Sequence, residues 1–309
     1  MAIWGNEGIL NKQTKAYILT LMVVTFWATA ASAFKIALRD VTPSTLLFYS
    51  ALFSTLSLFI ILCSQAKIGL LLKSNRSSLT KAALLGFLNP FLYYVILFKA
   101  YAILPGQIAM SLNYGWPLVL TLLSVPILGQ SLSKSQLLAV LVSFAGAVII
   151  STKGQFFSLG DVSSLGVLLA AGSTVIWAVY WLFNAKDGLD PVVKLFTGFC
   201  FGLFYTTLFC VFTGGIEIPI PRAWLPLIYV GLFEMSITFA LWLTALQLTS
   251  SAARIGNLIY ITPFFSLLTL NFVVGEQIHP ATFVGLTLII GSIFFQSWMN
   301  RKRLHLQGA

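Results

Sequence analysis

The sequence predicts an all-α integral membrane protein with ten transmembrane helices. Hydrophobic residues make up 58% of the 309 residues, charged residues make up only 8%, and the apolar residues form ten long runs separated by short polar breaks. A soluble domain carries roughly a quarter charged residues, and a bilayer-spanning helix needs about 20 mostly apolar ones. The predicted spans are residues 16–37, 43–64, 81–103, 105–128, 134–151, 163–185, 191–213, 223–246, 249–274 and 280–299.

A motif in the first half of the chain recurs in the second half: Tyr114, Pro117 and Gly129 match Tyr260, Pro263 and Gly275. An interior proline kinks a helix and is tolerated in lipid only where neighbouring groups satisfy the freed carbonyl. Each half holds five predicted spans, an odd number, so the second half enters the membrane from the opposite side. We therefore expect two inverted repeats, residues 1–153 and 154–309, an arrangement typical of alternating-access carriers.

The basic residues sort by the side of the membrane on which the predicted loops fall. The formal net charge of +10 alone would suit a nucleic-acid partner, but the charges follow membrane topology, so we expect no such partner. Segments on the side of the N-terminus carry Lys12, Lys15, Lys67, Lys73, Arg76, Lys81, Lys134, Lys186, Arg301, Lys302 and Arg303, and those on the other side carry Arg39, Lys153 and Arg222. The positive-inside rule places both termini in the cytoplasm, for a multi-pass protein of the cytoplasmic (inner) membrane.

Aromatic residues follow one face of the first predicted span in each half. Trp27 lies on such a face in the first span, and Trp177, Tyr180 and Trp181 share a face of the sixth. Two structural roles are the alternatives to lining a cavity: an aromatic belt at the membrane surface and ordinary side-chain packing. Trp177 lies too deep in its span for the belt, so we expect these rings to form one wall of a cavity.

Glu234 is the charged residue on which the functional prediction depends. It lies near the middle of the eighth predicted span, where an ionised carboxylate costs about 2.5–3.5 kcal/mol on insertion scales. Proton uptake, a cationic side chain or a cationic substrate would offset that cost. We expect Glu234 to pair with substrate or to exchange protons during transport, with Trp242 continuing its face of the helix.

Arg254 is a second charge inside a span, about one turn from the start of the ninth. An ion pair between Glu234 and Arg254 is the structural alternative to a functional role for each. The helical rise places Glu234 deeper by roughly 10 Å. An arginine would have to stretch to reach it, so separate roles are favoured.

The fourth and ninth spans supply polar groups for the opposite wall. Asn113 and Tyr114 lie on adjacent strips of the fourth span, and Asn257 and Tyr260 lie on the ninth. Asn113 has four hydrogen-bonding sites, which a neighbouring helix or a substrate can satisfy. The full set of expected substrate-binding residues is Trp27, Tyr93, Asn113, Tyr114, Trp177, Tyr180, Trp181, Glu234, Trp242, Arg254, Asn257 and Tyr260.

Several of these segments resemble the drug/metabolite transporter superfamily, specifically its ten-span EamA family. Residues 112–117 are similar to its fourth-span pattern, and Trp27-Ala28 and Trp177-Ala178 resemble the openings of its two halves. Pro263 followed by Gly275-Glu276 resembles its closing motif, whereas the first copy departs from it with Gly129-Gln130. The resemblance implies that spans 1, 3, 4, 6, 8 and 9 surround a central cavity and that spans 5 and 10 pack outside. It also implies carriage of small organic solutes, including amino acids.

We therefore expect a secondary active transporter that exports a small polar or amphipathic metabolite, an amino acid or related amine, by alternating access. Rings beside an acidic group suit an ammonium through cation–π contact and charge pairing. A passive channel and a membrane-embedded enzyme are the alternatives; the two histidines, His279 and His305, are too few and too peripheral for an enzyme's acid/base or metal site.

The expected partners are the small-molecule substrate and the lipid bilayer. We expect the protein to be a monomer or a homodimer. No cofactor or metal is expected. Cys63, Cys200 and Cys210 have neither metal-ligand nor disulfide spacing, and we interpret them as small core residues.

Overall fold

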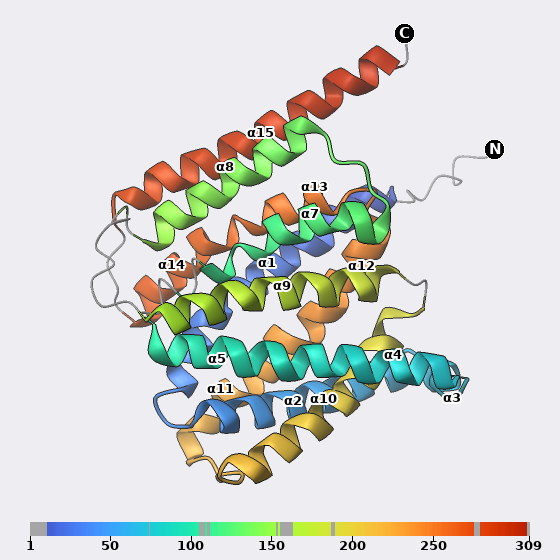
Figure 1. Ribbon diagram of the computed structural model, residues 1–309, viewed down its shortest axis with the longest axis vertical. Coiled ribbons are helices and arrows are strands. Elements are labelled where there is room, and N and C mark those ends of the chain that lie inside the picture. The colour runs from blue at the N-terminus through green and yellow to red at the C-terminus, as the bar shows by residue number, and fades with distance from the viewer. Residues whose placement is uncertain are drawn as a thin grey trace, which may run out of the picture.

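A computed structural model describes residues 11–73, 75–104, 109, 112–152, 154, 163–186, 189–274 and 279–307 of the chain (Figure 1). Within these ranges the regular structure is entirely helical, which agrees with the predicted class. Lys153 and residues 275–278, which include Gly275 and Glu276, lie outside the described residues.

The helices follow one another through short connections. The first group is α1 (Lys12–Ala37), α2 (Pro43–Ser64), α3 (Ile68–Leu72), α4 (Arg76–Gly86), η1 (Phe87–Leu92), α5 (Tyr93–Ile103), α7 (Trp116–Leu128) and α8 (Lys134–Ser151). The second is α9 (Ser164–Lys186), α10 (Pro191–Thr213), η2 (Pro221–Ala223), α11 (Trp224–Tyr229), η3 (Val230–Ser236), α12 (Ile237–Leu248), α13 (Ala252–Ile259), α14 (Thr262–Val274) and α15 (Ala281–Gln307).

Seven of the described helical segments are long and apolar enough to cross a membrane. Three shorter apolar helices, Trp116–Leu128, Lys134–Ile149 and Phe283–Phe295, accompany them. Large hydrophobic side chains such as Leu72, Phe212 and Phe272 are exposed on the outside of the bundle. Because a soluble protein would bury such residues, this surface is suited to hydrocarbon.

The helices pack as a bundle with two peripheral pairs. α8 lies along α15 at one side of the bundle, and α2 lies along α10 at the opposite side (Figure 1). Between these pairs, α1 packs against α12 and α14, while α9 packs against α5 and α7. The main buried cluster extends over α1, α5, α9 and α12, so the core lies in the middle of the bundle.

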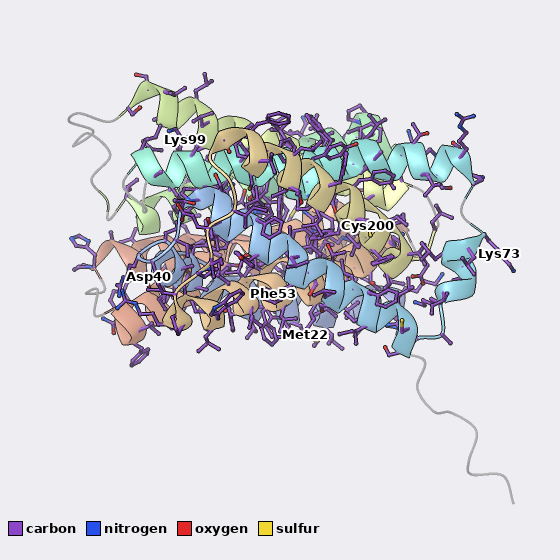
Figure 2. The ribbon with its side chains drawn as sticks, turned by 90° about the horizontal axis from the view of Figure 1, so that it is seen from below. Met22, Asp40, Phe53, Lys73, Lys99 and Cys200 are labelled. Atoms are coloured by element: carbon purple, nitrogen blue, oxygen red, sulfur yellow. The ribbon has the colours of Figure 1, made fainter. Side chains whose placement is uncertain are left out.

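The bundle has two ends, and an ion pair lies at each of them. Asp40 and Lys99 lie at one end and Lys73 at the other (Figure 2). We call these the Asp40 end and the Lys73 end. At the Asp40 end, Arg222 pairs with Asp40, with Nη2 2.6 Å from Oδ1. At the Lys73 end, Lys67 pairs with Asp190 across 2.6 Å.

Glycines allow two of the helix pairs to approach closely. A Cβ on Gly86 would lie 2.2 Å from the carbonyl oxygen of Gly198, and one on Gly146 would lie 2.6 Å from that of Gly285. These contacts join α4 to α10 and α8 to α15. Small residues at such crossings let backbones pack together in lipid.

Helical geometry is interrupted at the depth of the core. η1 and η3 are π-helical, and Asn89 within η1 has non-helical dihedrals (φ −153°, ψ 128°). The turn at residues 260–261 separates α13 from α14, and Pro117 and Pro263 are the second residues of α7 and α14. The expectation that these prolines accompany interruptions of their helices agrees with the structure.

One prediction about the core is wrong. Cys210 is buried, but Cys63 and Cys200 are exposed. Both lie on the peripheral pair α2 and α10, and a sulfhydryl is apolar enough to lie on a lipid-facing surface. Hydrophobicity alone therefore did not distinguish the core face from the outer face of these two helices.

Candidate functional site

A cavity of about 60 Å³ lies in the middle of the bundle, between α1, α5, α9 and η3 and the start of α7. Six of the residues expected to bind substrate line it: Trp27, Tyr93, Asn113, Tyr114, Trp177 and Glu234. They come from both halves of the chain. The remaining lining is apolar or aromatic and includes Phe34, Tyr101 and Trp116.

Glu234 is held in the wall of this cavity by contacts from the other half of the chain. Its side chain is on the π-helical segment η3, with only 7% of the residue exposed. Tyr94 on α5 donates a hydrogen bond to Oε1 across 3.0 Å, and Trp27 Nε1 donates to the Glu234 carbonyl across 3.3 Å. The other carboxyl oxygen, Oε2, has no partner among the described residues. Glu234 therefore retains acceptor capacity for a ligand.

No ion pair joins Glu234 to Arg254 within the described part of the chain. Arg254 lies on α13, near its start at the Lys73 end, and does not line the cavity. Its Nε has no partner among the described residues. The structure therefore agrees with the expectation that Glu234 and Arg254 do not form an ion pair. It places Arg254 outside the cavity lining.

Asn113 bridges two neighbouring elements. Its Nδ2 lies 3.1 Å from Ser173 Oγ on α9 and 3.2 Å from the hydroxyl of Tyr93 on α5. Neighbouring helices thus satisfy both of its N–H groups, as one of the two expected alternatives requires. The side chain still forms part of the cavity wall, where its position is set by these bonds.

Four tryptophans meet beside Glu234. The ring of Trp27 lies 5.8 Å from Trp116, 5.7 Å from Trp177 and 5.9 Å from Trp242, measured between centroids. Trp116 and Trp242 are 5.5 Å apart and nearly perpendicular. These tilted and edge-to-face contacts are the favourable geometries for aromatic rings. Trp27, Trp116 and Trp177 line the cavity, and Trp242 packs against Trp27 and Trp116.

Tyr180, Trp181 and Trp242 lie behind the cavity wall and do not line it. Trp181 and Trp242 are fully buried, and the Trp181 ring lies 4.8 Å from Phe239 of α12. The cause is the packing of α9 against α12, which covers the turn that follows Trp177. We expected Tyr180 and Trp181 to form part of the wall. In this structure they lie behind it, where Trp181 packs against the ring of Trp177 and Tyr180 packs against Trp181.

Asn257 and Tyr260 also lie outside the cavity. Ser143 of α8 donates a hydrogen bond to Asn257 Oδ1 across 2.5 Å, and Tyr260 packs in a separate cluster near Phe144. Asn257 lies on α13 and Tyr260 directly follows this helix, and both face α8. We expected both on the cavity wall, and the structure places them beside α8 instead.

Tyr94, Trp116 and Tyr101 complete the site, and the expected set did not include them. Trp116 and Tyr101 line the cavity, and Tyr94 holds Glu234 from behind it. Trp116 belongs to the repeated motif, which was a signal that could have identified it. Nothing in the sequence distinguished Tyr94 from the adjacent Tyr93.

The EamA-like transporter family matches residues 14–152 and again residues 164–298. The chain belongs to this family. It is therefore a multi-pass membrane transporter of the drug/metabolite type, and the resemblance stated from the sequence is confirmed.

Individual relatives of the EamA protein are distant. The aromatic amino acid exporter YddG of Ancylobacter novellus is 26% identical over 215 residues, which cover 68% of this chain and 73% of the relative. The uncharacterized transporter YvbV of Bacillus subtilis is also 26% identical, over 67% of this chain and 68% of its own length. An uncharacterized transporter of Archaeoglobus fulgidus is 23% identical over 91% of this chain and 96% of its own.

The fold itself has a solved counterpart. A crystal structure superposes with a TM-score of 0.79 at 21% identity, covering 93% of this EamA chain and 98% of the other. The agreement over nearly the full length of both chains supports the helix arrangement described above.

Proposed function

We propose that this protein is a secondary active transporter that exports an amino acid or a related amine across the cytoplasmic membrane by alternating access. The observation that carries the proposal is a pair of buried polar atoms at the cavity. Glu234 Oε2 is an acceptor and Trp177 Nε1 is a donor, and neither has a partner among the described residues. An amino acid offers an ammonium donor and a carboxylate acceptor, so one ligand can satisfy both atoms.

The aromatic lining favours a cationic group on the ligand. Tyr93 and Trp177 are only 4.3 Å apart between ring centroids, and Trp27 lies next to Trp177. Ring faces attract an ammonium, most strongly where water is excluded. Glu234 supplies the matching negative charge. In this proposal Glu234 also couples transport to protons, because it is the acidic side chain of the cavity wall.

The dimensions of the cavity support alternating access. A volume of about 60 Å³ holds roughly four water molecules, which is less room than an amino acid requires. The lining extends toward the Asp40 end through Phe34 and Tyr101, whereas Trp181, Phe239 and Trp242 fill the space toward the Lys73 end. In the proposed cycle the helices move apart at one end to admit the substrate and then at the other end to release it.

Two five-helix inverted repeats, residues 1–153 and 154–309, account for several paired features. The contacts of α1 with α12 and α14 are matched by those of α9 with α5 and α7. The π-helical segments η1 and η3 occupy equivalent places in the two halves. The family matches the chain twice, over residues 14–152 and 164–298. These correspondences support an inverted repeat with ten spans.

The charges at the two ends support cytoplasmic termini. Lys67, Lys73, Lys134 and Lys186 belong to the Lys73 end, where α2, α8 and α9 each have one terminus. Positive residues accumulate on the cytoplasmic side of membrane proteins. In this orientation the cavity faces outward. We propose that the unit which transports is a single chain, alone or within a homodimer, because both walls of the cavity come from one chain.

Counterflow in proteoliposomes tests the proposed function. Vesicles preloaded with an unlabelled amino acid should accumulate the labelled one transiently, and matched acids that lack the amine should not exchange. The assay starts with aromatic amino acids, because the relative from Ancylobacter novellus is named as their exporter. Uptake that never exceeds equilibrium would indicate a passive channel, and exchange of amine-free analogues at equal rates would overturn the proposed substrate class.

A further inference from the structure

Two adjoining cavities lie at the Lys73 end, away from the substrate cavity. The first is an apolar groove of about 650 Å³ between α4, η1 and α9, open on the outer surface of the bundle. Leu84, Phe87 and Phe183 line it, and these side chains are 64%, 42% and 46% exposed. The second, of about 30 Å³, has a mixed lining, in which Ser78, Asn184 and Thr197 supply polar groups beside apolar side chains.

The two cavities share Lys81 and Leu85. The apolar groove therefore leads directly to a small cavity that contains polar side chains, with Lys81 at the junction and Lys186 at the end of α9 beside the groove. A ligand that fits both parts has a long apolar chain and a polar, negatively charged head. A phospholipid of the surrounding bilayer has this structure.

We propose that an anionic phospholipid binds at this place, with an acyl chain in the groove and its phosphate between Lys81 and Lys186. Neither cavity has an Asp or Glu among its described lining residues. Both lysines are exposed, and no ion pair of either is recorded within the described residues. The charge of the site is thus complementary to the phosphate.

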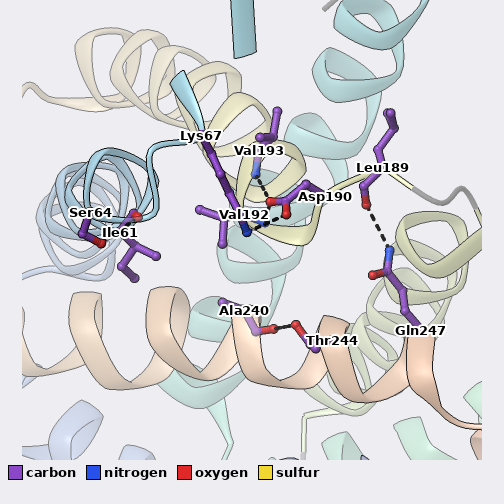
Figure 3. Close-up of polar contacts among 10 residues, drawn as sticks. All are labelled: Ile61, Ser64, Lys67, Leu189, Asp190, Val192, Val193, Ala240, Thr244 and Gln247. Carbon is purple, nitrogen blue, oxygen red and sulfur yellow. Dashed lines mark hydrogen bonds and ion pairs between the residues drawn. The ribbon is translucent and has the colours of Figure 1, made fainter. Parts of the chain in front are cut away.

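The nearest described acid is already engaged. Asp190 pairs with Lys67 across 2.6 Å and accepts hydrogen bonds from the amides of Val192 and Val193, so that it caps α10 (Figure 3). Lys194, which lines the smaller cavity, donates a hydrogen bond to the carbonyl of Asn184 and is held in the wall. Lys81 and Lys186 therefore remain as the cations available to a head group.

The lipid would contact both halves of the protein. α4 and η1 belong to the first half, α9 belongs to the second, and the segments pack against each other at the edge of the groove. An acyl chain in the groove would fill an opening that side chains leave between them. We expect the bound lipid to stabilise the packing of α4 against α9.

Native mass spectrometry of the detergent-purified full chain tests this site. The probes are phosphatidylglycerol and phosphatidylcholine with identical acyl chains. Phosphatidylglycerol should bind more tightly, and Lys81→Gln/Lys186→Gln should weaken its binding by about fivefold for each lysine removed. Lys81→Arg/Lys186→Arg keeps both charges and should retain the preference. The matched control, Lys73→Gln/Lys134→Gln, removes two exposed lysines that line neither cavity and should leave binding unchanged.

Three outcomes would overturn the proposal. Equal binding of the two lipids would exclude recognition of the phosphate charge. An equal loss in the control pair would indicate attraction to the whole basic end. Glycerol phosphate that displaces phosphatidylglycerol at equal concentration would indicate a site for free anions. Val179→Trp, which places a large ring in the groove, gives a second measurement if the lysine variants fold poorly, and it should reduce the affinity for both lipids.

Discussion

The hydroxyl of Tyr94 donates a hydrogen bond to Oε1 of Glu234 across 3.0 Å, and thereby joins α5 of the first half to η3 of the second. The two carboxyl oxygens differ in their hydrogen bonding: Oε1 accepts this bond, whereas Oε2 has no partner within the described part of the chain. The bond fixes the orientation of the carboxyl group in the cavity wall.

Replacing Glu234 by Gln should remove most transport of an amine substrate. The amide keeps the size of the side chain but loses its charge, and a hydrogen bond to a charged group is worth roughly 1.5–3 kcal/mol. Apparent affinity should fall by about tenfold or more, since 1.4 kcal/mol is a factor of ten. The pH dependence of transport should also flatten. Glu217→Gln, which changes an exposed acid remote from the cavity, is the control, and transport by Glu234→Gln with an unchanged pH profile would contradict the coupling role.

Replacing Tyr94 by Phe should lower both thermal stability and transport. The ring remains, but the bond to Glu234 is lost, and this costs roughly 1.5–3 kcal/mol. Tyr205→Phe is the matched control, because Tyr205 makes ring contacts with Phe87 and Phe91 and no hydrogen bond of its hydroxyl is recorded among the described residues. The measurement is the melting temperature in detergent of the unsubstituted protein, Tyr94→Phe and Tyr205→Phe. Equal melting temperatures for all three would show that the Tyr94 bond contributes nothing.

Asn113 and Asn257 should respond differently to substitution. Asn113→Ala changes the cavity wall, so it should weaken substrate binding by several fold as well as reduce stability. Asn257→Ala breaks a contact with Ser143 outside the cavity, so it should lower the melting temperature and leave substrate affinity unchanged. Substrate-dependent shifts of the melting temperature measure both effects. A loss of substrate affinity in Asn257→Ala would indicate that Asn257 does take part in substrate binding.

Replacing Gly86 by Ala should destabilise the bundle. The new Cβ would lie 2.2 Å from the Gly198 carbonyl oxygen, which is backbone and cannot rotate away. Overpacking of this kind costs about 1–3 kcal/mol. In Gly172→Ala the Cβ meets nothing within 4 Å, and the variant should be neutral or slightly stabilised because Gly is a poor helix former. A melting temperature for Gly86→Ala at or above that of Gly172→Ala would contradict the close approach of α4 and α10.

Helix boundaries were predictable wherever composition marks them sharply. The predicted ranges 43–64, 134–151 and 191–213 coincide with α2, α8 and α10. Pro43 and Pro191 begin two of these helices, a position that proline favours because its missing N–H would be unpaired there anyway. The π-helical geometry of η1 and η3 was not predictable, since an apolar run of the same composition also suits an ordinary α-helix.

The candidate site was predictable in part. Trp27, Trp177 and Glu234 line the cavity. Tyr114 lines it too, but its counterpart in the repeat, Tyr260, does not, and neither does Asn257. An internal repeat relates positions along the chain, and it does not make the neighbours of the two copies identical. α13 directs its polar face to Ser143 of α8, whereas Asn113 contacts Ser173 of α9.

An apolar, helical chain of the EamA type with an acidic residue deep in one helix could be inferred before any coordinates, because hydropathy and charge are properties of composition and order. The packed bundle was needed to show that Tyr94 holds that carboxyl, that Arg254 does not, and that Trp181 and Trp242 lie behind the cavity wall. The helical period tells which residues share a face. The rotation of each helix against its neighbours depends on how all side chains pack together, and so it is a property of the assembled bundle.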